Sequence, residues 1–158
     1  MITAKTLKQL DVSKLKKPNG KTVKQDLMSE VNRLKDMIQA NMDKYINSYT
    51  PVQYQRTGQL QRSIRVGDIT VKGNKLSVRI YFDDGAIMRK SGYGMDWEGT
   101  GETVNILLLM DRGYHVSKPV FFKNIEHFGF RNAALFIENA IIDFNRTSPY
   151  YAEFDYEY

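Results

Sequence analysis

The chain has no cysteine, which excludes disulfide bonds and thiolate metal sites. Its two histidines, His115 and His127, lack the two-histidine helical spacing of a zinc site. The longest apolar run, Ile106 to Met110, is far too short to span a bilayer, and the N-terminus lacks the apolar stretch of a signal peptide. We therefore expect a protein without membrane segments that assembles in a reducing cytoplasm.

Sequence signatures of catalysis are also missing. There is no cysteine nucleophile and no Gly-x-Ser-x-Gly elbow. Residues 99–103 superficially resemble a phosphate-binding loop, but Glu102 stands where that motif needs a lysine. The carboxylates of the segment 83–102 lack the fixed ligand spacing of a calcium loop; they are Asp83, Asp84, Asp96, Glu98 and Glu102. We expect a solvated acidic loop, and neither enzyme activity nor a cofactor nor a metal.

The composition is that of a globular protein, with 42% hydrophobic and 26% charged residues in a chain of 158. The net charge of +5 is uneven, because the first 24 residues hold seven lysines and one aspartate. We divide the chain into a basic N-terminal arm (1–21), a single domain (22–146) and an acidic aromatic tail (147–158). A basic arm can bind nucleic acid or an acidic partner, and a solvated, frayed terminus is the plainer interpretation.

A long helix is predicted over residues 23–49, because its apolar side chains recur at steps of three and four. Thr22 and Gln25 have the spacing of a capping box, and Thr50-Pro51 ends the pattern. We expect this helix to pack on a sheet rather than to form a coiled coil, since the stripe is shorter than four heptads. Its apolar positions are Val23, Leu27, Val31, Leu34, Ile38, Met42, Tyr45 and Tyr49.

A β-hairpin is predicted next, over residues 65–82, because apolar and polar residues alternate on both sides of Gly73-Asn74. This register places Asp68 opposite Arg79. Gly67 interrupts the alternation, so we expect a β-bulge there.

The rest of the chain gives weaker signals. We expect a glycine-rich loop over 83–103, and a strand or short helix over 104–110, between which periodicity cannot decide. A second helix is predicted over 130–145 from its apolar face. The fold class is therefore α+β: an antiparallel β-sheet containing the hairpin, packed against a long N-terminal helix and a C-terminal helix.

The segment between the first helix and the hairpin reads Arg56-Thr57-Gly58-x-Leu60-x-x-Ser63-Ile64. Thr57-Gly58 suits a tight turn, because glycine tolerates a positive φ. Leu60 and Ile64 are spaced to anchor a short turn in the core, and Arg56 and Arg62 then point outward, where carboxylates of a neighbour can pair with them. A plain helix-to-strand linker would have the same features.

This segment resembles a signature of the tail-completion (head–tail joining) proteins of tailed bacteriophages. Two weaker elements of that family follow in the same order, at 108–116 and at 128–140, so the resemblance covers about residues 23–145. Lys118-Pro119-Val120-Phe121 stands near the place of the family's usual Arg-Pro-Phe stretch, which is missing.

The resemblance implies a non-enzymatic virion protein of the phage neck, assembled in the host cytoplasm. Such proteins form rings, commonly sixfold, and contact connector or stopper proteins on one side and the tail terminator or tail tube on the other. DNA would pass through the ring lumen without specific binding. Tail terminators and other neck ring proteins are the nearest alternative.

A ring needs head-to-tail contacts between copies. We expect the lysine-rich arm of one subunit to pair with the acidic tail of the next, or the tail to add a strand to an exposed sheet edge. The loop 83–102 would contact the next ring or the channel. The expected interface residues are Lys14, Lys16, Lys17, Arg56, Arg62, Phe154, Tyr156 and Tyr158.

Two further alternatives belong to other classes. A nucleic-acid-binding module would use the basic arm and bind DNA in a strongly salt-dependent way, against which the acidic tail argues. A hydrolase would need a convergent polar pocket, for which the sequence offers no residues.

Overall fold

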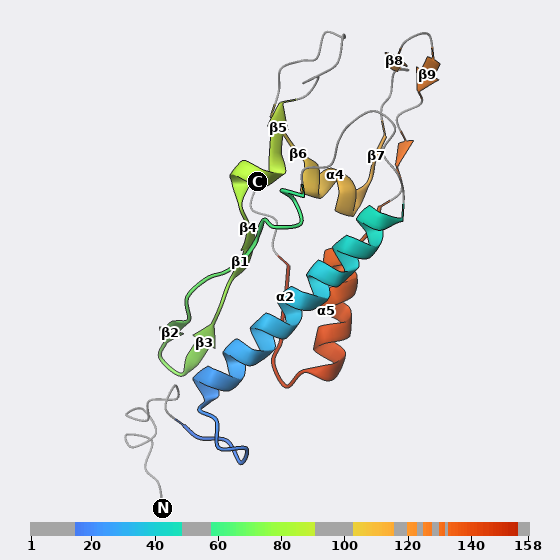
Figure 1. The fold of residues 1–158 in the computed structure, drawn as a ribbon. Helices are drawn as coiled ribbons and strands as arrows, with labels where there is room; N and C mark the ends of the chain where they lie inside the picture. Colours follow the sequence, from blue (N-terminus) through green and yellow to red (C-terminus); the bar gives the residue numbers. More distant parts are fainter. Residues whose placement is uncertain are drawn as a thin grey trace, which may run out of the picture.

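The computed structural model describes residues 15–48, 58–90, 103–115, 120–122, 125–127, 130–131 and 133–154 (Figure 1). Groups of two or four strands separate the helices along these ranges, and each described sheet is an antiparallel pair. The helices are α2 (Val23–Asn47), α3 (Asp84–Ile87), α4 (Ile106–Arg112) and α5 (Phe136–Thr147). The paired strands are β1 (Ile64–Val66) with β4 (Ile80–Phe82), β2 (Thr70–Lys72) with β3 (Lys75–Ser77), β5 (Met88–Lys90) with β6 (Thr103–Asn105), β7 (Tyr114–His115) with β10 (Phe130–Arg131), and β8 (Val120–Phe122) with β9 (Ile125–His127).

Helix α2 confirms the predicted long helix and its capping box. The Thr22 hydroxyl accepts from the Gln25 amide, and the Gln25 side chain accepts from the Thr22 amide. The helix ends at Asn47, before the predicted Tyr49, which lies outside the described residues. Ile46 is buried although the predicted stripe passed over it, because a period of 3.6 residues brings both Tyr45 and Ile46 toward the core near the end of the helix.

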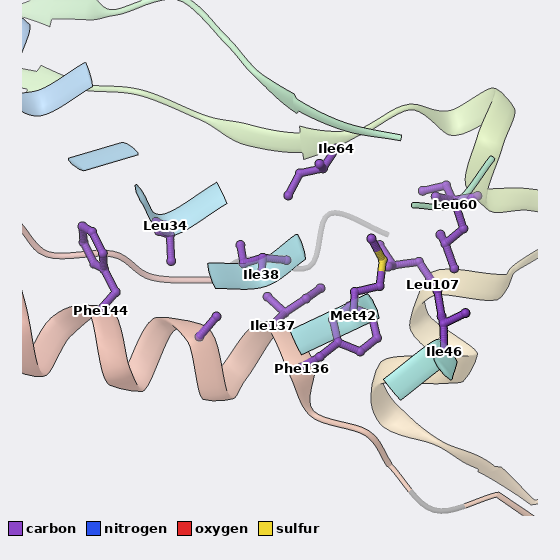
Figure 2. Close-up of a cluster of buried hydrophobic side chains, with 12 residues drawn as sticks. Leu34, Ile38, Met42, Ile46, Leu60, Ile64, Leu107, Phe136, Ile137 and Phe144 are labelled. Atoms are coloured by element: carbon purple, nitrogen blue, oxygen red, sulfur yellow. The ribbon is translucent and has the colours of Figure 1, made fainter. Parts of the chain in front are cut away.

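The predicted hairpin is a two-part ribbon, formed by the pairs β1–β4 and β2–β3. It lies on one side of α2, and α5 packs antiparallel on the other side (Figure 1). The core lies between these layers and contains Ile38 and Met42 of α2, Ile64 of β1, and Phe136 of α5 (Figure 2). The α+β fold class predicted from the sequence is confirmed.

The predicted loop over 83–103 is shorter than expected. Asp83 caps α3 by accepting from the Gly85 amide, and β5 then pairs with β6 across residues 91–102, which lie outside the described residues. The segment 104–110, for which the sequence left a strand or a short helix open, contains both: the end of β6 is followed directly by α4. Asn105 joins them, since its side chain caps α4 by accepting from the Leu108 amide.

The predicted start of the second helix at Phe130 is wrong. Phe130 and Arg131 pair with His115 and Tyr114 in a short strand, and α5 begins only at Phe136. Leu135, with φ of 49° and ψ of 34°, is left-handed and separates the two elements. The apolar periodicity continued through this break, so pattern alone placed the helix start too early.

Candidate assembly surfaces

The motif segment 58–64 is a tight turn whose apolar residues face the core. The Arg62 amide donates to the Gly58 carbonyl at 3.2 Å, and Leu60 and Ile64 are both buried. Ser63 is 1% exposed, and its hydroxyl donates to the Leu60 carbonyl. These contacts confirm the predicted core anchors and join α2 to the ribbon.

Gly58 is required at the start of this turn. Its φ is +69°, and a Cβ added there would lie 2.7 Å from the Nη1 atom of Arg62. The guanidinium of Arg62 therefore covers the glycine, and the side chain is exposed, as predicted. Arg56 lies outside the described residues.

The ribbon contains the predicted β-bulge. Ile64 pairs with Phe82 and Val66 with Ile80, and the Gly67 amide donates to the Arg79 carbonyl at 2.8 Å. Thr70 then pairs with Ser77, so Asp68 and Ile69 together stand opposite Val78 alone. The predicted Asp68–Arg79 register is therefore wrong, because the extra residue places Arg79 opposite Gly67.

The bulge keeps the two faces of the ribbon in step across both pairs of strands. One face carries Ile64, Ile80 and Phe82, which belong to the core or pack against it, and the half-buried Val66. We call the opposite, exposed face the outer face. Its residues are assigned by the alternation of side chains along each strand. It consists of Arg65, Thr70, Lys72, Lys75, Ser77, Arg79 and Tyr81.

The inner face of the ribbon extends beyond the core at the tip. Val71 is 50% exposed, and its cross-strand neighbour Leu76 is half-buried. Neither belongs to the buried core cluster or to the side chains packed against it. We call these two residues the tip surface.

The end of the arm and the start of the tail meet within one chain. The Lys17 ammonium donates to the Asp26 carboxylate and lies 4.7 Å from the centre of the Tyr150 ring. The Tyr150 hydroxyl donates to the same carboxylate at 2.8 Å. The hydrogen bond with Asp26 raises the pKa of Lys17, and the one from Lys17 lowers the pKa of Asp26. Lys17 is therefore engaged by its own subunit.

The tail continues this intramolecular docking. Asn145 donates to the Ala152 carbonyl and accepts from the Ala152 amide, both at 2.8 Å. The Ser148 hydroxyl donates to Glu30 at 2.7 Å. Residues 148–154 form no strand, and the strand-like alternation predicted for Phe154–Tyr158 lies outside the described residues except for Phe154.

Two large side chains next to this docked segment remain exposed. Tyr151 is 80% exposed, beside Ala152, and Ile142 on α5 is 49% exposed, one turn before Asn145. We call Tyr151 and Ile142 the tail surface. It lies on different elements from the tip surface.

Asp111 joins α4 to α5 and was not singled out as a functional residue from the sequence. It is fully buried, and its Oδ1 accepts from the Ile137 amide at 3.1 Å, so it caps α5 from another helix. The Leu135 amide donates to the Asp111 carbonyl at 2.8 Å. Burial raises the pKa of Asp111, although Oδ2 lies 3.6 Å from the Nε atom of Arg112. An aspartate at the end of an apolar run was the only local signal.

The structure separates the interface residues predicted from the sequence rather than gathering them. Arg62 lies at the motif turn, Lys16 is exposed beside the turn of the arm, and Lys17 binds Asp26. Phe154 ends the described tail and is 36% exposed. Lys14, Arg56, Tyr156 and Tyr158 lie outside the described residues.

Among the described residues, no three His, Cys, Asp or Glu side chains are grouped closely enough to hold a metal ion. No helix in those ranges is long and apolar enough to cross a membrane.

Comparison with known proteins gives no relative. No family model, no curated protein and no solved structure matches the chain. Any proposal on function therefore depends on the motif and on the surfaces described above.

Proposed function

We propose that this protein is a structural subunit of the neck of a tailed bacteriophage, which completes the tail or joins it to the head as part of a ring. The motif Arg56 to Ile64 suggests the family, and the described part of the motif anchors the turn before the ribbon in the core. Leu60, Ser63 and Ile64 are buried where the helix meets the ribbon, so these positions tolerate few other residues.

The observation that supports assembly most directly is the pair of exposed apolar surfaces on different elements. A ring forms when one patch of a subunit contacts a different patch of its neighbour. Val71 of the tip surface is 50% exposed, and Tyr151 of the tail surface is 80% exposed. Exposed aromatic and aliphatic side chains of this kind commonly anchor interfaces. We propose that the tip surface of one subunit packs on the tail surface of the next.

This contact is separate from the arm-to-tail pairing expected from charge, most of whose residues lie outside the described ranges. Lys17 already binds Asp26 within the subunit, and Tyr150 packs against the same pair. Exchange of these partners between subunits would gain no new ion pair. The described part of the tail therefore contributes Tyr151 as a surface side chain rather than as an added strand.

Substitution of Tyr151 by serine tests the interface. Tyr151 is largely exposed, so the variant should fold like the wild type but lose ring formation. The same loss is expected for Val71→Ser. Leu15→Ser is a matched control, since Leu15 is 40% exposed but lies outside both surfaces. Mass by light scattering and negative-stain images of the full chain report the outcome, and equal assembly of all variants would exclude this interface.

The location in the virion needs a separate measurement. Cryo-electron microscopy of purified virions should show a ring of this fold at the head–tail junction. Contact with the connector would support a joining protein, whereas contact with the end of the tail tube would support the tail-terminator alternative. A well-resolved neck without this fold would contradict both.

A further inference from the structure

We propose that the outer face of the ribbon binds the phosphate backbone of double-stranded DNA. The proposal is independent of ring formation, since the whole site lies within one subunit. It also differs from binding by the basic arm, because the outer face lies on β1 to β4 and contains no residue of the segment 1–21.

The outer face carries the side chains that suit contact with phosphate. Its seven residues include four cations and three hydroxyl groups and no carboxylate. Cationic and hydroxyl side chains are the groups that contact DNA phosphates without reading sequence. The one acidic side chain between Arg62 and Phe82 is Asp68, in the bulge.

The bulge aligns these charges on one face of the ribbon. Alternate residues of a strand face the same side, and the extra residue at Asp68–Ile69 keeps Thr70 and Lys72 in phase with Arg65. Without it, β2 would present its polar side chains on the face that carries Ile64. The register therefore places all four cations on one face of the ribbon, which we call the cationic stripe, with Thr70 and Ser77 between Arg79 and the two lysines.

The dimensions of the stripe fit duplex DNA. Seven residue steps from Arg65 to Lys72, at about 3.3 Å each, span roughly 20 Å once the bulge is allowed for. This is more than half of one helical turn of DNA, which is about 34 Å long. A two-stranded ribbon is also narrow enough for the major groove, which is about 12 Å wide.

A protein partner fits this face less well. Protein interfaces are anchored by buried aromatic or apolar groups at their centre. Tyr81 is the only large side chain with apolar surface on the outer face, and it lies at the base of the ribbon opposite Arg65. A protein bound over the four cations would find no large apolar side chain among them to bury. Arg65 also has contacts within its own chain: its Nη1 donates to the Arg62 and Ile64 carbonyls, and its Nη2 lies 3.8 Å from Oδ2 of Asp83.

The test measures how the affinity of the full chain for DNA depends on salt concentration. Fluorescence anisotropy of a mixed-sequence duplex of about 30 base pairs reports the binding. Four phosphate contacts predict a slope of log K against log salt of about −3.6, a roughly hundredfold loss of affinity between about 50 and 200 mM salt. The Lys72→Gln/Lys75→Gln variant should halve this slope to about −1.8. Both lysines are exposed near the tip, so the variant should keep its fold, as circular dichroism will verify.

The matched control is Lys24→Gln/Lys44→Gln, which removes the same charge from exposed positions of α2. It should keep the wild-type slope. Equal slopes for the two double variants would overturn the proposal, because binding would then follow net charge alone. Absence of salt-dependent binding by the wild type would also overturn it. A third outcome would also overturn the proposal: the Lys72→Gln/Lys75→Gln variant binds DNA like the wild type but its assemblies have a different mass in solution. The stripe would then be a contact between copies of the chain.

Discussion

Asp111 shows how one buried carboxylate connects two helices. Its Oδ1 accepts from the Ile137 amide, where α5 has unpaired amides and a partial positive charge. Its Oδ2 accepts no hydrogen bond from the described residues and lies 3.6 Å from Arg112. Burial raises the pKa more than these favourable contacts lower it. The Asp111 carboxyl group therefore stabilises the fold through its hydrogen bond to α5, whereas its negative charge is destabilising because it is buried.

This balance gives Asp111 a definite pH dependence. Because its pKa is raised in the folded state, its contribution to stability is fully present below the unfolded value of about 3.9 and is lost as the pH rises through the folded value. Asp111→Asn keeps the acceptor but cannot titrate. The free energy of unfolding of the wild type relative to this variant should therefore increase as the pH falls from 7 to 4. Urea unfolding at both pH values measures this difference.

Asp111→Ala is the companion variant. It loses the cap and should be less stable than the wild type by about 1–2 kcal/mol at pH 7. A wild type that loses stability relative to Asp111→Asn in acid would contradict a raised pKa. It would mean that the amides of α5 favour the ionised carboxylate.

At the scale of elements, two features depend on single backbone conformations. Leu135, the residue before α5, has a left-handed backbone, and its side chain makes no capping hydrogen bond. Asp111 caps the helix instead, by accepting from the Ile137 amide. Gly58 is also left-handed and starts the motif turn. Glycine adopts this conformation without the strain that other residues meet there.

Gly58→Ala should lower the free energy of unfolding by about 1–2 kcal/mol, because the added Cβ imposes the cost of a left-handed residue and must displace the Arg62 guanidinium. Gly73→Ala is the control: its φ is +58° but no atom lies within 4 Å of an added Cβ. Thermal or urea unfolding compares the two. A larger loss for Gly73→Ala would show that contact with Arg62 adds no cost.

At the scale of the whole molecule, the two ends of the described chain are held on the same side of α2. Asp26 binds both Lys17 and Tyr150, and Glu30 accepts from Arg33 and Ser148. Tyr150 and Ala152 also pack against the core. The described segment after α5, residues 148–154, is thus part of the folded domain and not an appendage.

Deletion of residues 148–158 should therefore lower the free energy of unfolding by at least about 2 kcal/mol, since it removes apolar packing and several hydrogen bonds. Asn145→Ala, which removes only the two bonds to Ala152, should cost about 1–2 kcal/mol. Asp143→Ala on the same helix is a near-neutral control, because its ion pair with Arg146 is exposed. Unchanged stability on deletion would mean that the tail only rests on the surface.

Some residues of the candidate surfaces were predicted from the sequence, and others were found only in the structure. The exposure of Arg62 and the burial of Leu60 were predicted from their spacing in the motif. The tail surface was not, because the exposure of Tyr151 depends on how the tail docks on Asn145. The outer face of the ribbon required the bulge to be located to the residue, which the glycine alone indicated only approximately.

The sequence by itself determined what depends on near neighbours: the capping box and stripe of α2, the turn at Gly73-Asn74, and the α+β class. These features follow from hydrogen bonds and periodicities within a few residues. Only the tertiary structure decided the start of α5 and the path of the tail. Each depends on a partner distant in sequence, Asp111 for Ile137 and Asp26 for Tyr150. Local preferences cannot specify such contacts, because their free energy arises only when the elements pack together.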